Sequence, residues 1–201
     1  MYSTRSICSL PRRLGTVAKE DYRAILQEML LLPARMEQVL ENREDIQYFA
    51  SQYFNHDSVF YIGRNVDYAL GLEGSLKLKE ISYIHSEAYA SGELKHGTIS
   101  LIEDGTLVVA LGTYGRLFDK AMSNVVEVKS RGADVLALTT EDHREEMGRV
   151  ANGLVTIPVT HPILLPSLGV VPLQLFAYYV ALMRGCDIDK PRNLAKSVTV
   201  E

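Results

Sequence analysis

The sequence predicts an α/β domain in which a mostly parallel sheet lies between layers of helices. Short apolar runs recur along the chain, and segments with helical spacing separate them. The apolar runs are continuous rather than alternating, as expected of parallel strands that are buried on both faces. Hydrophobic residues make up 47% and charged residues 23% of the 201 residues. This composition is typical of a globular chain that can bury a sizeable core.

The N-terminal part is expected to be a helical extension. The first thirteen residues show no periodicity, whereas apolar residues recur at helical spacing from Asp21 to Leu40. Pro33 is expected to break or kink this stretch into two helices. A third helical segment runs from about Glu44 to Phe54, and a polar turn at 55–57 follows it.

The rest of the chain alternates strands with helices. Four predicted strands are Ser58–Ile62, Leu107–Leu111, Val135–Leu138 and Leu154–Ile157. Four predicted helices are Tyr68–Ile84, Arg116–Arg131, a weaker Asp142–Ala151, and Val171–Met183. We therefore expect an extension over 1–45, helical from about residue 20, an α/β domain over 46–185, and a tail over 186–201. No segment is expected to approach the roughly 18 apolar residues of a membrane span.

Charge and cysteine content exclude several classes of function. The net charge is −4, and no basic cluster exceeds two or three residues, so a nucleic-acid partner is not expected. Cys8 and Cys186 are expected to be free thiols in a reducing cytosol, and we expect a cytoplasmic protein. No segment shows metal-ligand spacing, a dinucleotide fingerprint, a P-loop or a nucleophile elbow, so neither a metal nor a cofactor is expected.

The helix over 69–84 carries charges where its apolar arc predicts core. At about 100° per residue, Leu72 and Leu76 share a wide arc. The centre of that arc holds Glu73, Lys77 and Glu80, and the opposite, thinner arc holds Gly71, Ser75, Lys79 and Ser82. Two interpretations stay open: a salt-bridged surface helix, or titratable groups that line a crevice.

Two further segments could carry chemistry. His96 lies in the run Gly92–Gly97, and a histidine titrates near neutral pH, so it is either a proton carrier or a surface residue. The polar tail after Asp189 is either frayed or docked through Val198 and Val200. A docked tail would deliver Lys196 to a site.

Four segments together resemble a known family. They are Leu72–His85, Glu87–Ala90, Gly92–Gly97 and Asp189–Glu201. They resemble the glutamine–fructose-6-phosphate aminotransferase (isomerizing) family, also called glucosamine-6-phosphate synthase, from roughly Arg13 to the last residue. The resemblance covers only the C-terminal isomerase part, the second sugar-isomerase (SIS) domain, and implies a three-layer, flavodoxin-like fold.

The resemblance implies a role for each matching residue. Glu80 corresponds to the base that moves a proton between C1 and C2 of the sugar, and Lys196 to the lysine that forms a Schiff base with open-chain fructose 6-phosphate. His96 corresponds to the ring-opening acid/base supplied by the neighbouring subunit. Lys77 corresponds to the group that stabilises the enolamine oxygen, and Glu73 to the carboxylate that orients the amine chemistry.

The resemblance also implies partners. Arg192, Asn193 and Ala195 are expected to bind the substrate, fructose 6-phosphate or glucosamine 6-phosphate, and the chain is expected to form a homodimer with His96 near the interface. Two parts of the family enzyme have no counterpart in these residues: the glutaminase cysteine and the first SIS half, whose hydroxyl-rich loop holds the sugar phosphate. The loops 63–67 and 112–116 lack that hydroxyl cluster.

Two hypotheses therefore remain. The chain is the isomerase half-site of an amino-sugar synthase, in which case the isolated chain is expected to be inactive. Alternatively, it is a non-catalytic SIS module that binds a sugar phosphate weakly or serves as a dimerisation remnant.

Overall fold

The computed structural model describes residues 18–192, which form a five-stranded parallel sheet with the strand order β2-β1-β3-β4-β5. The strands are β1 (Ser58–Gly63), β2 (His85–Ala90), β3 (Leu107–Gly112), β4 (Asp134–Thr140) and β5 (Gly153–Ile157). The α-helices are α2 (Lys19–Glu41), α3 (Arg43–Tyr53), α4 (Val66–Ser82), α5 (Phe118–Lys129), α6 (Arg144–Gly148) and α7 (Leu165–Met183). Short 3₁₀ helices include η1 (Ser91–His96), which follows β2.

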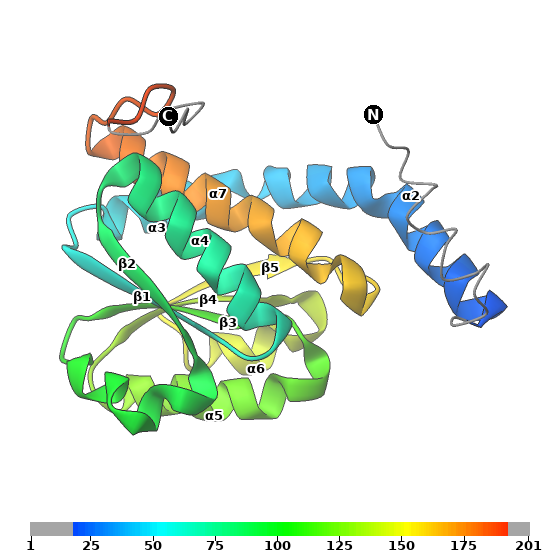
Figure 1. Ribbon diagram of the computed structural model, residues 1–201, viewed down its shortest axis with the longest axis horizontal. Coiled ribbons are helices and arrows are strands. Elements are labelled where there is room, and N and C mark those ends of the chain that lie inside the picture. The colour runs from blue at the N-terminus through cyan, green and yellow to red at the C-terminus, as the bar shows by residue number, and fades with distance from the viewer. Residues whose placement is uncertain (1–17, 193–201) are drawn as a thin grey trace, which may run out of the picture.

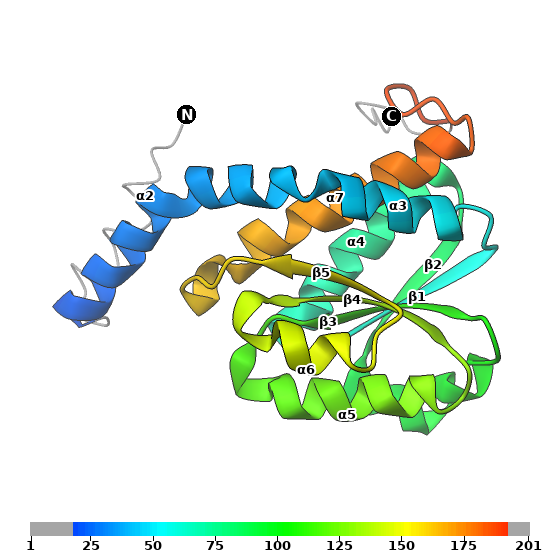
Figure 2. The same cartoon turned by 180° about the vertical axis from the view of Figure 1, so that it is seen from behind.

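Helices cover both faces of the sheet, as the continuous apolar strands predict. Figures 1 and 2 show α3, α4 and α7 above the sheet and α5 and α6 below it. One buried cluster joins the first group of helices to the sheet, and it includes the fully buried Leu78 and Leu168. A second cluster joins Leu94 of η1 and Val128 of α5 to the opposite face. The predicted three-layer α/β class is therefore confirmed.

The four predicted strands are present, but the prediction missed a fifth, β2. Its sequence, HSEAYA, is polar, and only Ser86 is fully buried along it. This strand lies at the edge of the sheet and pairs with β1 alone, from Ser58↔His85 to Gly63↔Ala90. An edge strand needs less apolar surface than a central one, so the search for apolar runs passed over it.

The helical predictions are confirmed with two changes. The helix α2 continues through Pro33, so the expected break is wrong, although the ribbon bends part-way along α2 (Figures 1 and 2). The last helix begins at Leu165 rather than Val171 and contains Pro172. Figure 1 also shows that the first part of α2 projects away from the sheet. The boundaries at 45/46 and 185/186 remain predictions.

The expectation that no segment approaches the length and hydropathy of a membrane span is wrong for Pro162–Met183. This segment is 22 residues long and apolar enough, by length and composition, to cross a membrane. Half of its most apolar window is buried inside the protein, and Leu168, Phe176 and Val180 are core residues. A buried core helix passes the same test of composition, so a single helix of this kind is weak evidence for a span.

The orientation predicted for α4 is wrong. The buried face carries the small residues Gly71, Gly74 and Ser75 together with Leu70 and Leu78, whereas Leu72 and Leu76 are 47% and 41% exposed. Small residues bring the helix close to its neighbours: a Cβ at Gly74 would lie 2.8 Å from Leu173 Cδ1 and 2.9 Å from Tyr61 Cε1. Close packing of the small residues against β1 and α7, together with the burial of the two leucines, thus decides which face is inside.

The two glycines of α4 provide a test of this packing. We expect Gly74→Ala to lower the free energy of unfolding by about 1–3 kcal/mol, because the added methyl meets α7 and Tyr61. Gly71→Ala is the matched control, since its Cβ would come nearest to the flexible end of Leu111, at 3.3 Å, and would meet its other neighbours at ordinary contact distances of 3.5 Å or more. Its stability should stay within about 1 kcal/mol of wild type. Equal free energies of unfolding for the Gly74→Ala and Gly71→Ala variants in urea denaturation would contradict this packing.

Candidate functional site

Three of the predicted site residues meet on the outer face of α4. Lys77 Nζ lies 2.8 Å from Glu80 Oε2 and 3.7 Å from Glu73 Oε1, one helical turn away on either side. The side chains are 32%, 28% and 42% exposed, respectively, so the cluster is partly open to solvent rather than part of the core. The helix spacing therefore places two carboxylates around one ammonium group.

The electrostatics of the cluster define the state of Lys77. The hydrogen bond to Glu80 is the largest influence, and it raises the pKa of Lys77 above the ordinary value of 10.5, while partial burial opposes the rise. A raised pKa keeps the amine protonated at neutral pH. Lys77 is thus suited to stabilise negative charge and poorly suited to act as a nucleophile.

The C-terminal segment meets α4 beside this cluster. Tyr83 follows α4 in the left-handed conformation, with φ of 63°. The backbone N–H of Arg192 donates to Tyr83 Oη at 2.8 Å, and the guanidinium carbon lies 4.1 Å from the ring centroid. Tyr83 comes three residues after Glu80, so the tail begins at the same end of α4 as the candidate base. Asn193, Ala195 and Lys196 lie outside the described residues.

The structure does not bring His96 to this cluster within one chain. His96 ends η1, whose Leu94 belongs to the buried cluster on the α5 side of the sheet. Its imidazole is 75% exposed, and Nδ1 lies 2.8 Å from Glu93 Oε2. Glu80, in contrast, lies on α4 across the sheet (Figure 1).

Sequence reasoning missed Asp67, which lies in the first turn of α4 and holds the loop after β3 by hydrogen bonds. Its carboxylate accepts hydrogen bonds from the backbone N–H of Thr113 at 3.0 Å, from Thr113 Oγ1 at 2.5 Å, and from the backbone N–H of Tyr114 at 3.1 Å. Asp67 is 2% exposed, and burial raises the pKa of its carboxyl against the opposing effect of these hydrogen bonds. Three donors of this loop are therefore already occupied by an anion from α4. An acidic residue in the first helical turn after a strand is the signal that could have indicated it.

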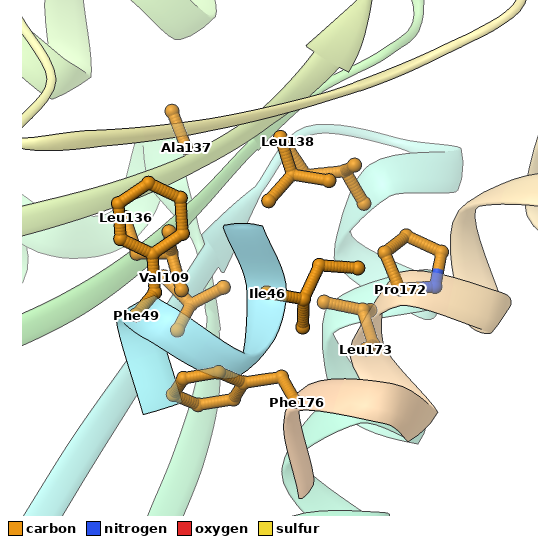
Figure 3. A pocket seen from close by; sticks show the side chains of 10 residues that line it. Ile46, Phe49, Val109, Leu136, Ala137, Leu138, Pro172, Leu173 and Phe176 are labelled. Carbon is orange, nitrogen blue, oxygen red and sulfur yellow. The ribbon is translucent and has the colours of Figure 1, made fainter. Parts of the chain in front are cut away.

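An apolar cavity lies between α3, α7 and the sheet. Figure 3 shows that Phe49, Ile46 and Phe176 point into it from the helices, opposite Leu136 and Val109 of the strands. Ten apolar residues line the cavity, and they include no side chain that could transfer a proton or bind a charged group. The cavity belongs to the core and offers no catalytic group.

Between Ala18 and Arg192, no group of three or more His, Cys, Asp or Glu side chains could hold a metal ion.

The strand order 2-1-3-4-5 and the doubly covered parallel sheet define the flavodoxin-like class of open α/β domains. A profile of the SIS domain matches residues 52–184. The chain belongs to the SIS domain family, and its sequence matches the C-terminal SIS part of glutamine–fructose-6-phosphate aminotransferases.

Similar proteins support this placement. The glutamine–fructose-6-phosphate aminotransferase (isomerizing) of Clostridium acetobutylicum is 54% identical over 187 residues, which cover 93% of this chain and 31% of that protein. The Thermus thermophilus enzyme of the same name is 48% identical over 190 residues, or 94% and 31% of the two chains. This chain thus spans about a third of the length of these relatives.

Solved structures show the same fold. The C-terminal domain of glucosamine-fructose-6-phosphate aminotransferase from Francisella tularensis superposes with a TM-score of 0.87 at 30% identity, covering 91% of this chain and 51% of that one. A glucosamine-6-phosphate deaminase from Thermotoga maritima has a TM-score of 0.65 at 26% identity, covering 94% and 52%.

The contacts of Lys77 predict a measurable coupling. Glu80→Gln should lower the pKa of Lys77 towards 10.5, and Glu73→Gln should lower it less, because Glu73 is farther away and contributes less. NMR titration of the lysine side chain measures both shifts. Because the folded-state pKa is raised, any stability from this cluster is present below pH 10.5 and is lost as the pH rises through the folded-state value. An equal or larger effect of Glu73→Gln would refute the assigned geometry.

Proposed function

We propose that this chain provides the isomerase half-site of an amino-sugar synthase, which converts fructose 6-phosphate to glucosamine 6-phosphate. The observation that carries the proposal is the cluster of Glu73, Lys77 and Glu80 beside the point where the tail meets Tyr83. The printed name of the similar aminotransferases supplies the substrate, and the fold and the cluster are compatible with it.

In this proposal, each group has one task. The free amine of Lys196 attacks the C2 carbonyl of the open-chain sugar, and loss of water gives a Schiff base. After ammonia has displaced the lysine amine, Glu80 takes a proton from C1 and returns it to C2. Lys77, held protonated by its two carboxylates, stabilises the enolamine oxygen, and Glu73 orients the amine. Arg192, Asn193 and Ala195 bind the substrate.

The ring-opening step requires a second copy of the chain. His96 is proposed as the acid/base that opens the sugar ring, but it lies across the sheet from Glu80 in its own chain. A neighbouring subunit would supply it, and its exposure of 75% leaves it free to reach a partner. The proposal therefore includes a homodimer.

A specific observation favours the second candidate function for the isolated chain. Asp67 occupies the three donors of the loop after β3, which leaves that loop few groups with which to hold a sugar phosphate. Without a firm hold on the phosphate, the reacting carbons are not positioned against Glu80. The chain by itself would then be a non-catalytic SIS module that binds a sugar phosphate weakly.

Borohydride trapping separates the two functions. With fructose 6-phosphate and sodium borohydride, we expect a reduced sugar adduct at Lys196, detected by peptide mass spectrometry, and its loss in Lys196→Arg. The exposed Lys19 of α2, which lies outside both sites, provides the background level of labelling in the same digest. Labelling of Lys196 at or below that background would contradict the half-site and leave the non-catalytic module.

The role of Glu80 needs its own readout. Glu80→Gln should retain the trapped adduct, because imine formation does not need this base. With ammonium present to displace the lysine, it should slow exchange of the C1 hydrogen of the sugar with D₂O by about 10²–10⁴-fold. The isolated chain should give no glucosamine 6-phosphate from glutamine. Unchanged C1 exchange in Glu80→Gln would remove Glu80 from the mechanism.

A further inference from the structure

A basic groove lies on the side of the sheet opposite the α4 cluster. Its cations are Arg64 after β1, Lys95 of η1, Lys120 of α5, and Arg131, which lies just after α5. Glu127 is the only anion among the residues that line it. Four positive charges against one negative charge leave the groove at about +3, although the whole chain carries −4. The concentration of positive charge at one place is therefore not a consequence of overall composition.

The fold sets Arg64 at a place where ligands bind in this class of sheet. Gly63 and Ala90 end the paired strands β1 and β2, so Arg64 and Gly92 both lie just beyond the carboxyl edge. The strand order reverses between β1 and β3. In open α/β sheets, ligands bind in the crevice outside the carboxyl ends at such a switch point. Arg64 borders that crevice, and the rest of the groove runs from there along α5.

Arg64 is held in one orientation by two contacts. Its Nε donates to Asn124 Oδ1 at 3.0 Å, and Asn124 is 6% exposed, so a buried amide fixes the guanidinium. On the other side, the guanidinium lies against Gly92, where a Cβ would come within 3.2 Å of Arg64 Nη1. A half-buried arginine oriented in this way differs from a solvated surface lysine. Its side chain is already ordered in the free protein, so binding a ligand costs it less conformational entropy.

Glu127 arranges two of the other cations. It lies 3.6 Å from Lys95 Nζ and 3.5 Å from Arg131 Nη2, and its own side chain is 15% exposed. The side chain of Lys120 has no ion pair or hydrogen bond among the residues that the structure describes. The groove thus combines an oriented guanidinium, two cations held by a shared carboxylate, and one unpaired cation.

We infer that this groove binds the phosphate group of a small phosphorylated ligand, at a site distinct from the α4 cluster. A phosphomonoester carries about −1.5 to −2 at neutral pH, which complements the groove, and the planar guanidinium of Arg64 can donate two hydrogen bonds to phosphate oxygens. The α4 cluster lies across the sheet, between about 10 Å (Glu73) and about 20 Å (Glu80) along the helix from its first residue, Val66. Because the loop after β3 is occupied by Asp67, the groove supplies anion donors that this loop does not.

The test uses the 201-residue chain and follows the amide NMR signals of Gly92 and Asn124 during titration with inorganic phosphate. We expect saturable shifts at these two residues. Arg64→Gln should weaken binding by about tenfold or more, since a charged hydrogen-bond donor is lost. Arg149→Gln is the matched control: it removes the same charge from an exposed site outside the groove, and affinity should change less than twofold. Equal effects of the two variants would show diffuse charge attraction and overturn the inference.

A charge-neutral variant tests whether the site is built rather than merely basic. Gly92→Ala keeps every charge but pushes against Arg64, so we expect phosphate affinity to fall about threefold. Unchanged affinity would contradict the role of the Gly92 contact.

Titrations with fructose 6-phosphate and fructose identify the recognised group: the phosphate ester should shift the same two signals, and the neutral sugar should not. Shifts with fructose, or no saturation with phosphate, would refute the assignment. Lys196→Arg should leave these shifts unchanged, so this test is independent of the proposed isomerase chemistry.

Discussion

The three hydrogen bonds accepted by the Asp67 carboxylate join the start of α4 to the loop after β3. Both groups are buried, so each would carry a large desolvation cost without the other. The contact is tight on the strand side as well, since a Cβ at Gly63 would lie 2.5 Å from the carbonyl carbon of Asp67. These contacts fix where α4 begins, and together with the close packing of Gly74 they set its rotation, on which the positions of Glu73, Lys77 and Glu80 depend.

The rotation of α4 explains how one helix can pack against the core and also present the charged groups of the candidate site. Its small residues pack against β1 and α7, and this close approach leaves the longer charged side chains on the outer face. There the two carboxylates keep Lys77 protonated at modest cost, because all three groups retain contact with water. The same helix ends at Tyr83, on which Arg192 rests, so one element positions both the charged cluster and the start of the tail.

The sequence alone predicted the layers and four strands, because apolar runs and helical spacing are local properties. It did not predict β2, whose polar residues suit an edge strand, nor the rotation of α4, which depends on how closely Gly74 approaches Leu173 and Tyr61. The site residues came from motifs rather than from geometry. Asp67 and the Arg64 groove were missed because their partners, Thr113 and Asn124, are 46 and 60 residues away in sequence.

Amide hydrogen exchange tests the claim that Asp67 fixes α4 to the loop after β3. The N–H groups of Thr113 and Tyr114 should exchange slowly in the wild-type chain, and the nearby Gly115, which is exposed, should exchange quickly. In Asp67→Ala, the protection at Thr113 and Tyr114 should fall by about tenfold or more, as expected for the loss of hydrogen bonds to a charged acceptor. Rapid exchange of both groups in the wild type, or protection unchanged by the substitution, would contradict the account.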